Sequence, residues 1–125
     1  MTIIQSFTDL NAWKESHKLV LLIYKFSRTF PPEEKFGLTN QIRRATLSIT
    51  SNITEGFSRN SAKEKAQFYY MALGSLRETQ NQLILAKDLG YLAKKQFSEI
   101  FEISMASSKL INGLIKSAKK MAPRS

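Results

Sequence analysis

Residues 38–59 read LTNQIRRATLSITSNITEGFSR, and their apolar side chains recur every three or four positions. This spacing places on one side of an α-helix the residues Leu38, Ile42, Ala45, Ile49, Ile53 and Phe57. Apart from Leu47, the rest of the helix surface is polar. Because so narrow an apolar strip has to be covered by other helices, we expect the chain to supply partner helices.

The residues before this helix predict another helix that ends at Pro31-Pro32. One apolar line comprises Leu10, Trp13, His17, Val20, Tyr24 and Ser27, and a second comprises Leu19, Ile23, Phe26 and Phe30. We expect residues 1–8 to form a short arm and Thr8 or Asp9 to cap the helix. Residues 19–24 are apolar almost all round, so we expect either the bundle centre or another subunit to cover them.

Two further helices are predicted after residue 60. Ser61-Ala62-Lys63-Glu64 has the form of a capping box, and Gly90 is suited to end the helix that starts there. The small pair Gly74-Ser75 within that helix predicts the close approach of another backbone. A last helix is expected from about Lys94 to Met121, before Pro123.

These four helices predict an all-α fold, an antiparallel up-down-up-down four-helix bundle. No alternation of period two lasts long enough to indicate a strand. The short connections allow each helix only to return alongside the one before it. We expect residues 1–125 to form a single domain with a basic C-terminal end, residues 119–125.

The chain is strongly basic, with 19 Lys and Arg against 10 Asp and Glu and a net charge of +9. Residues 93–125 contain seven of these basic residues and two acidic ones. Such an excess favours an anionic partner, although it also serves solubility. The absence of cysteine excludes disulfides and cysteine-based sites. With no secretory signal or apolar segment of membrane-spanning length in the sequence, we expect a cytoplasmic protein with no membrane partner.

The sequence contains no arrangement typical of an enzyme. His17, the single histidine, lies on the apolar line beside Trp13, where packing is a commoner role than catalysis. One histidine cannot supply the paired Glu-x-x-His motifs of two-iron bundles. Ser48, Ser51 and Asn52 have no neighbouring histidine or lysine that could activate a nucleophile. We therefore expect no enzymatic activity, no metal, no cofactor and no small-molecule substrate.

The polar face of the helix over residues 38–59 predicts a structural role for its side chains. In an antiparallel pair, Arg43 and Arg44 lie level with Glu78 of the next helix. We expect Arg44 or Arg43 to pair with Glu78 and to fix the helix register more than the stability. Asn52 and Glu55 are expected to bond to backbone near the helix end or at a subunit contact. The alternative is a face that simply meets solvent.

Three segments closely resemble the bacterial four-helix-bundle proteins of the 23S rRNA-intervening sequence protein family. They are FTDLNAW (residues 7–13), FPPEEKFGLTNQIRRATLSITSNITEGFSR (residues 30–59) and FYYMALGSLRETQNQLILAKDLGYL (residues 68–92). The resemblance covers roughly Phe7 to Leu92 and fades in the last helix. Thr50 and Thr54 depart from the proline and alanine that relatives often carry, and both changes favour a less interrupted helix.

The resemblance implies antiparallel bundles that assemble into rings, commonly of five subunits. It also implies a distant relationship to the accessory variability protein of diversity-generating retroelements, a basic five-subunit barrel that binds a reverse transcriptase and nucleic acid. A homo-oligomer, and specifically a pentamer, is therefore the assembly that the resemblance predicts.

Two functions fit these observations. The first is a non-catalytic oligomeric accessory protein that binds RNA or DNA through phosphate contacts. Its candidate residues are Arg43, Arg44, Arg59, Lys63, Lys116, Lys119 and Lys120. The second is a structural adaptor that recruits a protein partner, with the basic surface serving solubility. A lack of acidic residues after Glu102 favours the first, and the scarcity of aromatic residues expected at the surface speaks against single strands.

Overall fold

Four long helices account for most of residues 3–121, the part of the chain that the computed structural model describes. The elements are η1 (Phe7–Asp9), α1 (Asn11–Ser27), η2 (Pro32–Glu34), α2 (Leu38–Ser58), α3 (Ala62–Asp88) and α4 (Lys94–Met121). Between residues 3 and 121 no strand is present. Of the expected basic C-terminal end, residues 119–121 belong to α4, and residues 122–125 lie outside the described residues.

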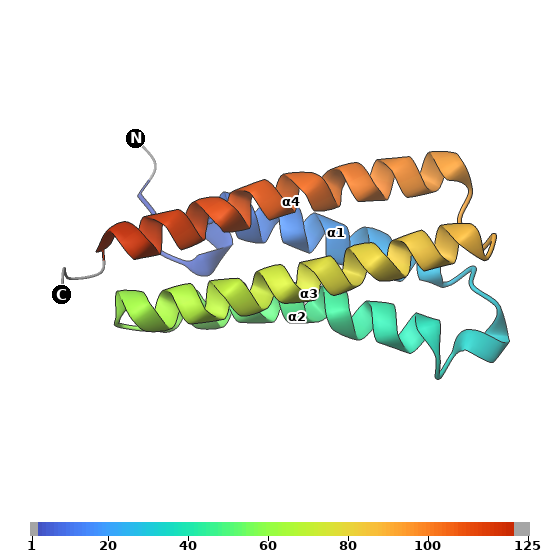
Figure 1. Cartoon of the computed structure of the whole chain (residues 1–125), viewed down its shortest axis with the longest axis horizontal. Helices are drawn as coiled ribbons and strands as arrows, with labels where there is room; N and C mark the ends of the chain where they lie inside the picture. Colours follow the sequence, from blue (N-terminus) through green and yellow to red (C-terminus); the bar gives the residue numbers. More distant parts are fainter. Residues whose placement is uncertain (1–2, 122–125) are drawn as a thin grey trace.

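The helices lie side by side, and the chain reverses direction at each connection (Figure 1). Each helix contacts two neighbours: α1 packs on α2 and α4, and α3 packs on α2 and α4. The pairs α1–α2 and α3–α4 therefore form opposite sides of the molecule. This arrangement confirms the predicted antiparallel four-helix bundle.

The core follows the apolar periodicity of α2. The side chains of this seam that are buried are Leu38, Ile42, Ala45, Ile49 and Ile53. Phe57, expected to continue the seam, is only half-buried, and its neighbour Gly56 is buried in its place. Leu47 is exposed, as its position off the seam predicts.

The apolar segment of α1 is covered on one side only. Leu19 and Ile23 are buried in the core, whereas Leu21 and Tyr24 are exposed. Exposed apolar side chains on a helix often mark a contact with another molecule. Among residues 3–121, no side chain covers the outer side of Leu21, which is 59% exposed.

The helix ends match the predictions in part. The expected cap of α1 by Thr8 or Asp9 is wrong, because Ser6 caps the short η1 turn and forms a capping box with Asp9. The two backbone N–H groups that donate to the Asp9 carboxylate, from Gln5 and from Ser6, lower its pKa. At α3, Ser61 Oγ accepts from the Glu64 N–H at 3.1 Å, which confirms the predicted cap. Among the described residues, the Glu64 side chain makes no return bond to the Ser61 N–H, so only half of the predicted capping box is present.

Glu34 links the two loops at one end of the bundle. Its Oε1 accepts from the Leu38 N–H at 3.0 Å, which satisfies an exposed amide at the start of α2. Its Oε2 accepts from the Tyr91 hydroxyl at 2.9 Å, in the connection between α3 and α4. Gly90, with a φ of 81°, makes the turn that brings Tyr91 there. Both hydrogen bonds lower the pKa of Glu34, and the bond to Glu34 raises the pKa of Tyr91.

Glu34→Gln should lower the midpoint of thermal unfolding at neutral pH and have a smaller effect in acid. The Glu34 pKa in the folded protein is below its ordinary value of 4.5, so ionised Glu34 stabilises the fold above pH 4.5. That contribution is lost as the pH falls through the lowered folded pKa. Thermal melts at about pH 7 and about pH 3 would measure it. Glu33→Gln, on the neighbouring exposed residue, is the control, and an equal pH response of the two variants would contradict the prediction.

Candidate nucleic-acid interface

Arg43 is held against α1. Its Nε donates to Ser27 Oγ at 2.8 Å, and its Nη2 donates to the Tyr24 carbonyl at 3.4 Å. The guanidinium lies 4.9 Å from the centre of the Tyr24 ring. These contacts make Arg43 a structural link between α1 and α2, although its charge still adds to the surface potential.

The predicted ion pair with Glu78 is absent. Arg44 and Glu78 line the same groove between α2 and α3, yet within residues 3–121 no ion pair joins them. Arg44 is exposed, and a solvated pair gains little over two separately hydrated groups. The side-chain hydrogen bonds between these helices run instead from Ser75 Oγ to Ser48 Oγ at 2.9 Å and from Lys65 Nζ to the Phe57 carbonyl at 2.7 Å. The prediction that Arg44 lies level with Glu78 is confirmed, and the prediction that the two side chains form an ion pair is wrong.

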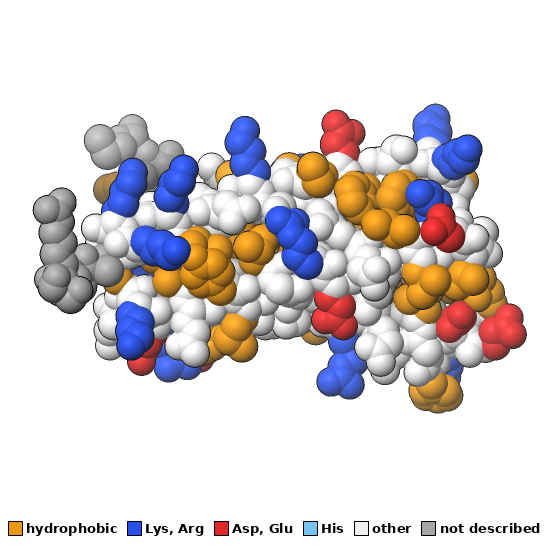
Figure 2. Space-filling model, viewed as in Figure 1, with side chains coloured by type: hydrophobic (Ala, Val, Ile, Leu, Met, Phe, Trp, Pro, Cys, Tyr) orange, Lys and Arg blue, Asp and Glu red, His pale blue; other side chains and the backbone are white. Residues whose placement is uncertain are grey.

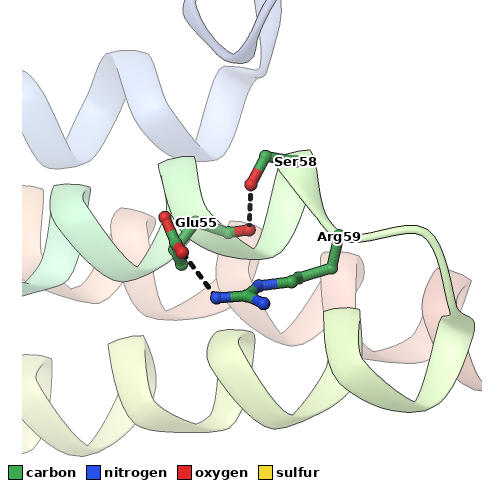
Figure 3. A network of polar contacts seen from close by, with 3 residues as sticks. All are labelled: Glu55, Ser58 and Arg59. Carbon is green, nitrogen blue, oxygen red and sulfur yellow. Dashed lines mark hydrogen bonds and ion pairs between the residues drawn. The ribbon is translucent and has the colours of Figure 1, made fainter.

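Glu55 and Arg59 form an ion pair of 2.6 Å at the end of α2, beside the hydrogen bond from Ser58 Oγ to the Glu55 carbonyl (Figure 3). The Arg59 guanidinium also lies 4.6 Å from the Phe68 ring. Arg59 therefore joins the end of α2 to α3, and its charge is partly neutralised. Asn52 donates to the Ser48 carbonyl at 2.9 Å inside its own helix, so it bonds to backbone but not at the predicted helix end. The predicted backbone bond of Glu55 is wrong, because its carboxylate pairs with Arg59.

The remaining candidates gather at one end of the bundle. The start of α3 and the end of α4 lie together there (Figure 1), and they carry Lys63, Lys116, Lys119 and Lys120. All four lysines are exposed, and Lys119 Nζ lies 5.1 Å from the Tyr70 ring. Arg43 and Arg44 lie further along the bundle on α2. The structure thus separates the seven predicted residues into two groups.

Lys109, Lys116, Lys119 and Lys120, in the second half of α4, form no ion pair within residues 3–121. No acidic residue occurs from Ile103 to Met121. The ion pairs of residues 3–121 are Lys18–Glu15, Arg59–Glu55 and Lys87–Asp88, none of which includes these lysines. Figure 2 shows the α3–α4 face, where Lys and Arg side chains flank hydrophobic ones. This face has the charge needed to attract an anionic polymer.

Sequence reasoning missed Arg77 and Lys109. Both line one groove with Lys116, between α3 and α4. Lys109 and Lys116 are seven residues apart, a spacing that places them on one helix face and could have identified them. Arg77 could not have been assigned in this way, because it comes from the neighbouring helix.

Two further properties follow from the described residues. Across residues 3–121, His, Asp and Glu side chains do not form a group of three that could hold a metal ion. None of the helices in that range has an apolar segment long enough to cross a bilayer.

Comparison with known proteins shows a family whose sequence pattern this chain matches. The family model for the 23S rRNA-intervening sequence protein matches residues 8–113, which extends the recognised similarity into α4. The chain is also similar to the crystal structure of a protein of unknown function from the S23 ribosomal protein family of Bacteroides thetaiotaomicron. The TM-score is 0.78 and the identity 26%, over 84% of this chain and 95% of that chain. A search of curated proteins found no match.

Proposed function

Because the chain belongs to the 23S rRNA-intervening sequence protein family, we propose that it is a non-catalytic accessory protein that binds RNA or DNA through the phosphate backbone. The observation that carries the proposal is the group of exposed lysines where α3 begins and α4 ends. Lys116, Lys119 and Lys120 lie there on a helix segment without acidic residues. Flexible lysines of this kind contact phosphates without selecting a base sequence.

Self-assembly would strengthen such contacts. A ring of five copies, the assembly proposed from the family resemblance, would present five lysine groups to one polymer and multiply weak binding. Exposed Leu21 on α1 and Leu47 on α2 support a contact between copies, because both are apolar and uncovered in the single chain. Their helices, α1 and α2, form the side of the bundle opposite α3 and α4.

Binding should weaken steeply as salt is added and depend little on base sequence. Each neutralised phosphate contributes about 0.7 to 0.9 to the slope of log affinity against log salt concentration. Fluorescence anisotropy with labelled RNA and labelled duplex DNA, at about 50 and about 200 mM salt, would measure that slope. The absence of binding to either polymer at the lower concentration would end the proposal and leave an adaptor that recruits a protein partner.

A further inference from the structure

A groove of about 770 Å³ runs between α3 and α4. Three cations line it, Arg77 from α3 and Lys109 and Lys116 from α4. The two lysines are two helical turns apart, or about 10 Å at 1.5 Å per residue. Two cations at that separation can contact different phosphates of one nucleic-acid strand.

No carboxylate lines this groove. Glu78, although adjacent to Arg77 in sequence, lines the separate groove between α2 and α3. None of the three cations belongs to an ion pair within residues 3–121. The groove therefore has an unneutralised positive charge that matches a phosphate backbone.

Apart from the three cations, Ser108 and Asn112, the groove lining is apolar and open. Met105 is 57% exposed there, and Ala106 and Gly113 add no polar side-chain atoms. A Cβ on Gly113 would meet nothing within 4 Å, so packing inside this chain does not require a glycine. Glycine weakens a helix relative to alanine, and its presence leaves room for a molecule that approaches the helix closely.

Tyr70 provides an exposed aromatic ring towards the end of the bundle, contrary to the expectation from the sequence that few aromatic residues at the surface speak against single strands. It is 46% exposed, and Lys119 Nζ lies 5.1 Å from its ring. Tyr70 also lines a shallow hollow with Lys63 and Met71. Bases of single strands stack on exposed aromatic rings of this kind, beside cations that contact the phosphates.

We propose that the α3–α4 groove binds a single strand of nucleic acid. Arg77, Lys109 and Lys116 contact its phosphates, and Met105 and Tyr70 contact its bases. The inference rests on the proposed function and goes beyond it, because it assigns the site and selects single strands over duplexes. In a duplex the base faces are stacked on one another, so the apolar side chains of the groove would have no partner.

The test compares two triple variants that lower the net charge of +9 equally. The groove variant carries Arg77→Gln, Lys109→Gln and Lys116→Gln. The control carries Lys14→Gln, Arg28→Gln and Lys95→Gln, at exposed positions outside the groove. With a labelled single-stranded RNA, the groove variant should lose affinity at least about tenfold and reduce the salt slope by about 2, at 0.7 per phosphate. The control variant should retain most of the affinity and most of the salt slope.

A second pair of measurements separates this inference from the proposed function. Wild-type protein should bind single-stranded RNA or DNA at least about fivefold more tightly than a duplex of the same sequence, since stacking is available only to the single strand. Equal binding of the two triple variants, or preference for the duplex, would overturn the groove assignment while general nucleic-acid binding stands. If the wild-type protein binds none of these polymers, both the groove assignment and the proposed function are wrong.

Gly113→Leu provides a variant that fills the groove without removing charge. The space around Gly113 and the better helix propensity of leucine should keep the protein folded, with an unchanged or higher thermal midpoint. Affinity for single strands should fall at least about fivefold, because the added side chain occupies the room for the bases. Unchanged affinity together with a smaller mass in sedimentation would show that another copy of the chain occupies the groove, and would overturn the inference.

Discussion

Leu83→Ala should lower the free energy of unfolding by about 2–5 kcal/mol, the usual cost of removing a fully buried leucine side chain. Leu83 on α3 is 0% exposed and belongs to the core that all four helices share. The substitution removes apolar area from that core and leaves a cavity, because the packed helices can close around it only in part. Urea denaturation, with helix content followed by circular dichroism at about 222 nm, would measure the loss of unfolding free energy.

Leu85→Ala is the matched control, since it makes the same chemical change two positions further along the same helix. Leu85 is 46% exposed, so its truncation should change the unfolding free energy by about 0.5 kcal/mol or less. Equal losses in the two variants would contradict the burial seen in the single chain. They would show that Leu85 is covered as well, by another copy or by a partner.

Most of the core was predictable because the period of a helix fixes which side chains share a face. Ile42, Ile49 and Ile53 are buried for this reason, whatever the exact crossing of the helices. The end of α2 was not predictable in the same way. Phe57 fits the period, but α3 comes so close to α2 that Gly56 takes the buried position. The distance between two helices depends on the side chains of both, which periodicity in one helix does not describe.

The candidate site was predicted less well than the core. Sequence reasoning found the lysines near the end of α4 because they form a run without acidic residues. It assigned Arg43 to an ion pair or to phosphate contact, whereas that side chain turns towards Tyr24 and Ser27 of α1. The level of a residue along a bundle follows from helix lengths, but the direction of a long side chain depends on the local partners.

The glycines illustrate the same limit. The Gly74-Ser75 pair predicted a close approach of backbones, and Ser75 does meet Ser48 of α2. A Cβ on Gly74, however, would meet nothing within 4 Å. The close approach that requires glycine occurs instead at Gly56, in a segment where the sequence alone shows an ordinary helix end. The two glycines therefore predict opposite effects of the same substitution.

Gly56→Ala should destabilise the protein by about 1–3 kcal/mol, the range for overpacking a well-packed core. A Cβ at this position would lie 2.6 Å from Tyr69 Cε1 and 2.9 Å from Tyr69 Cδ1, far inside normal contact. Tyr69 is 4% exposed, so its ring cannot turn into solvent without opening the contact between α2 and α3. This clash outweighs the gain of up to about 1 kcal/mol in helix propensity that alanine brings.

Gly74→Ala on α3 isolates that propensity term, because outside its own stretch of helix backbone the added methyl group meets no described atom within 4 Å. It should therefore stabilise the protein by about 0.5–1 kcal/mol. Urea denaturation of both variants measures the two effects on one scale. Stabilisation of similar size in both would mean that Tyr69 moves aside freely, and the tight packing of α2 on α3 would then contribute little to the stability of the bundle. Opposite signs would show that this one contact sets how closely the two helices can lie, which in turn positions Arg59 and Lys63 at the basic end of the molecule.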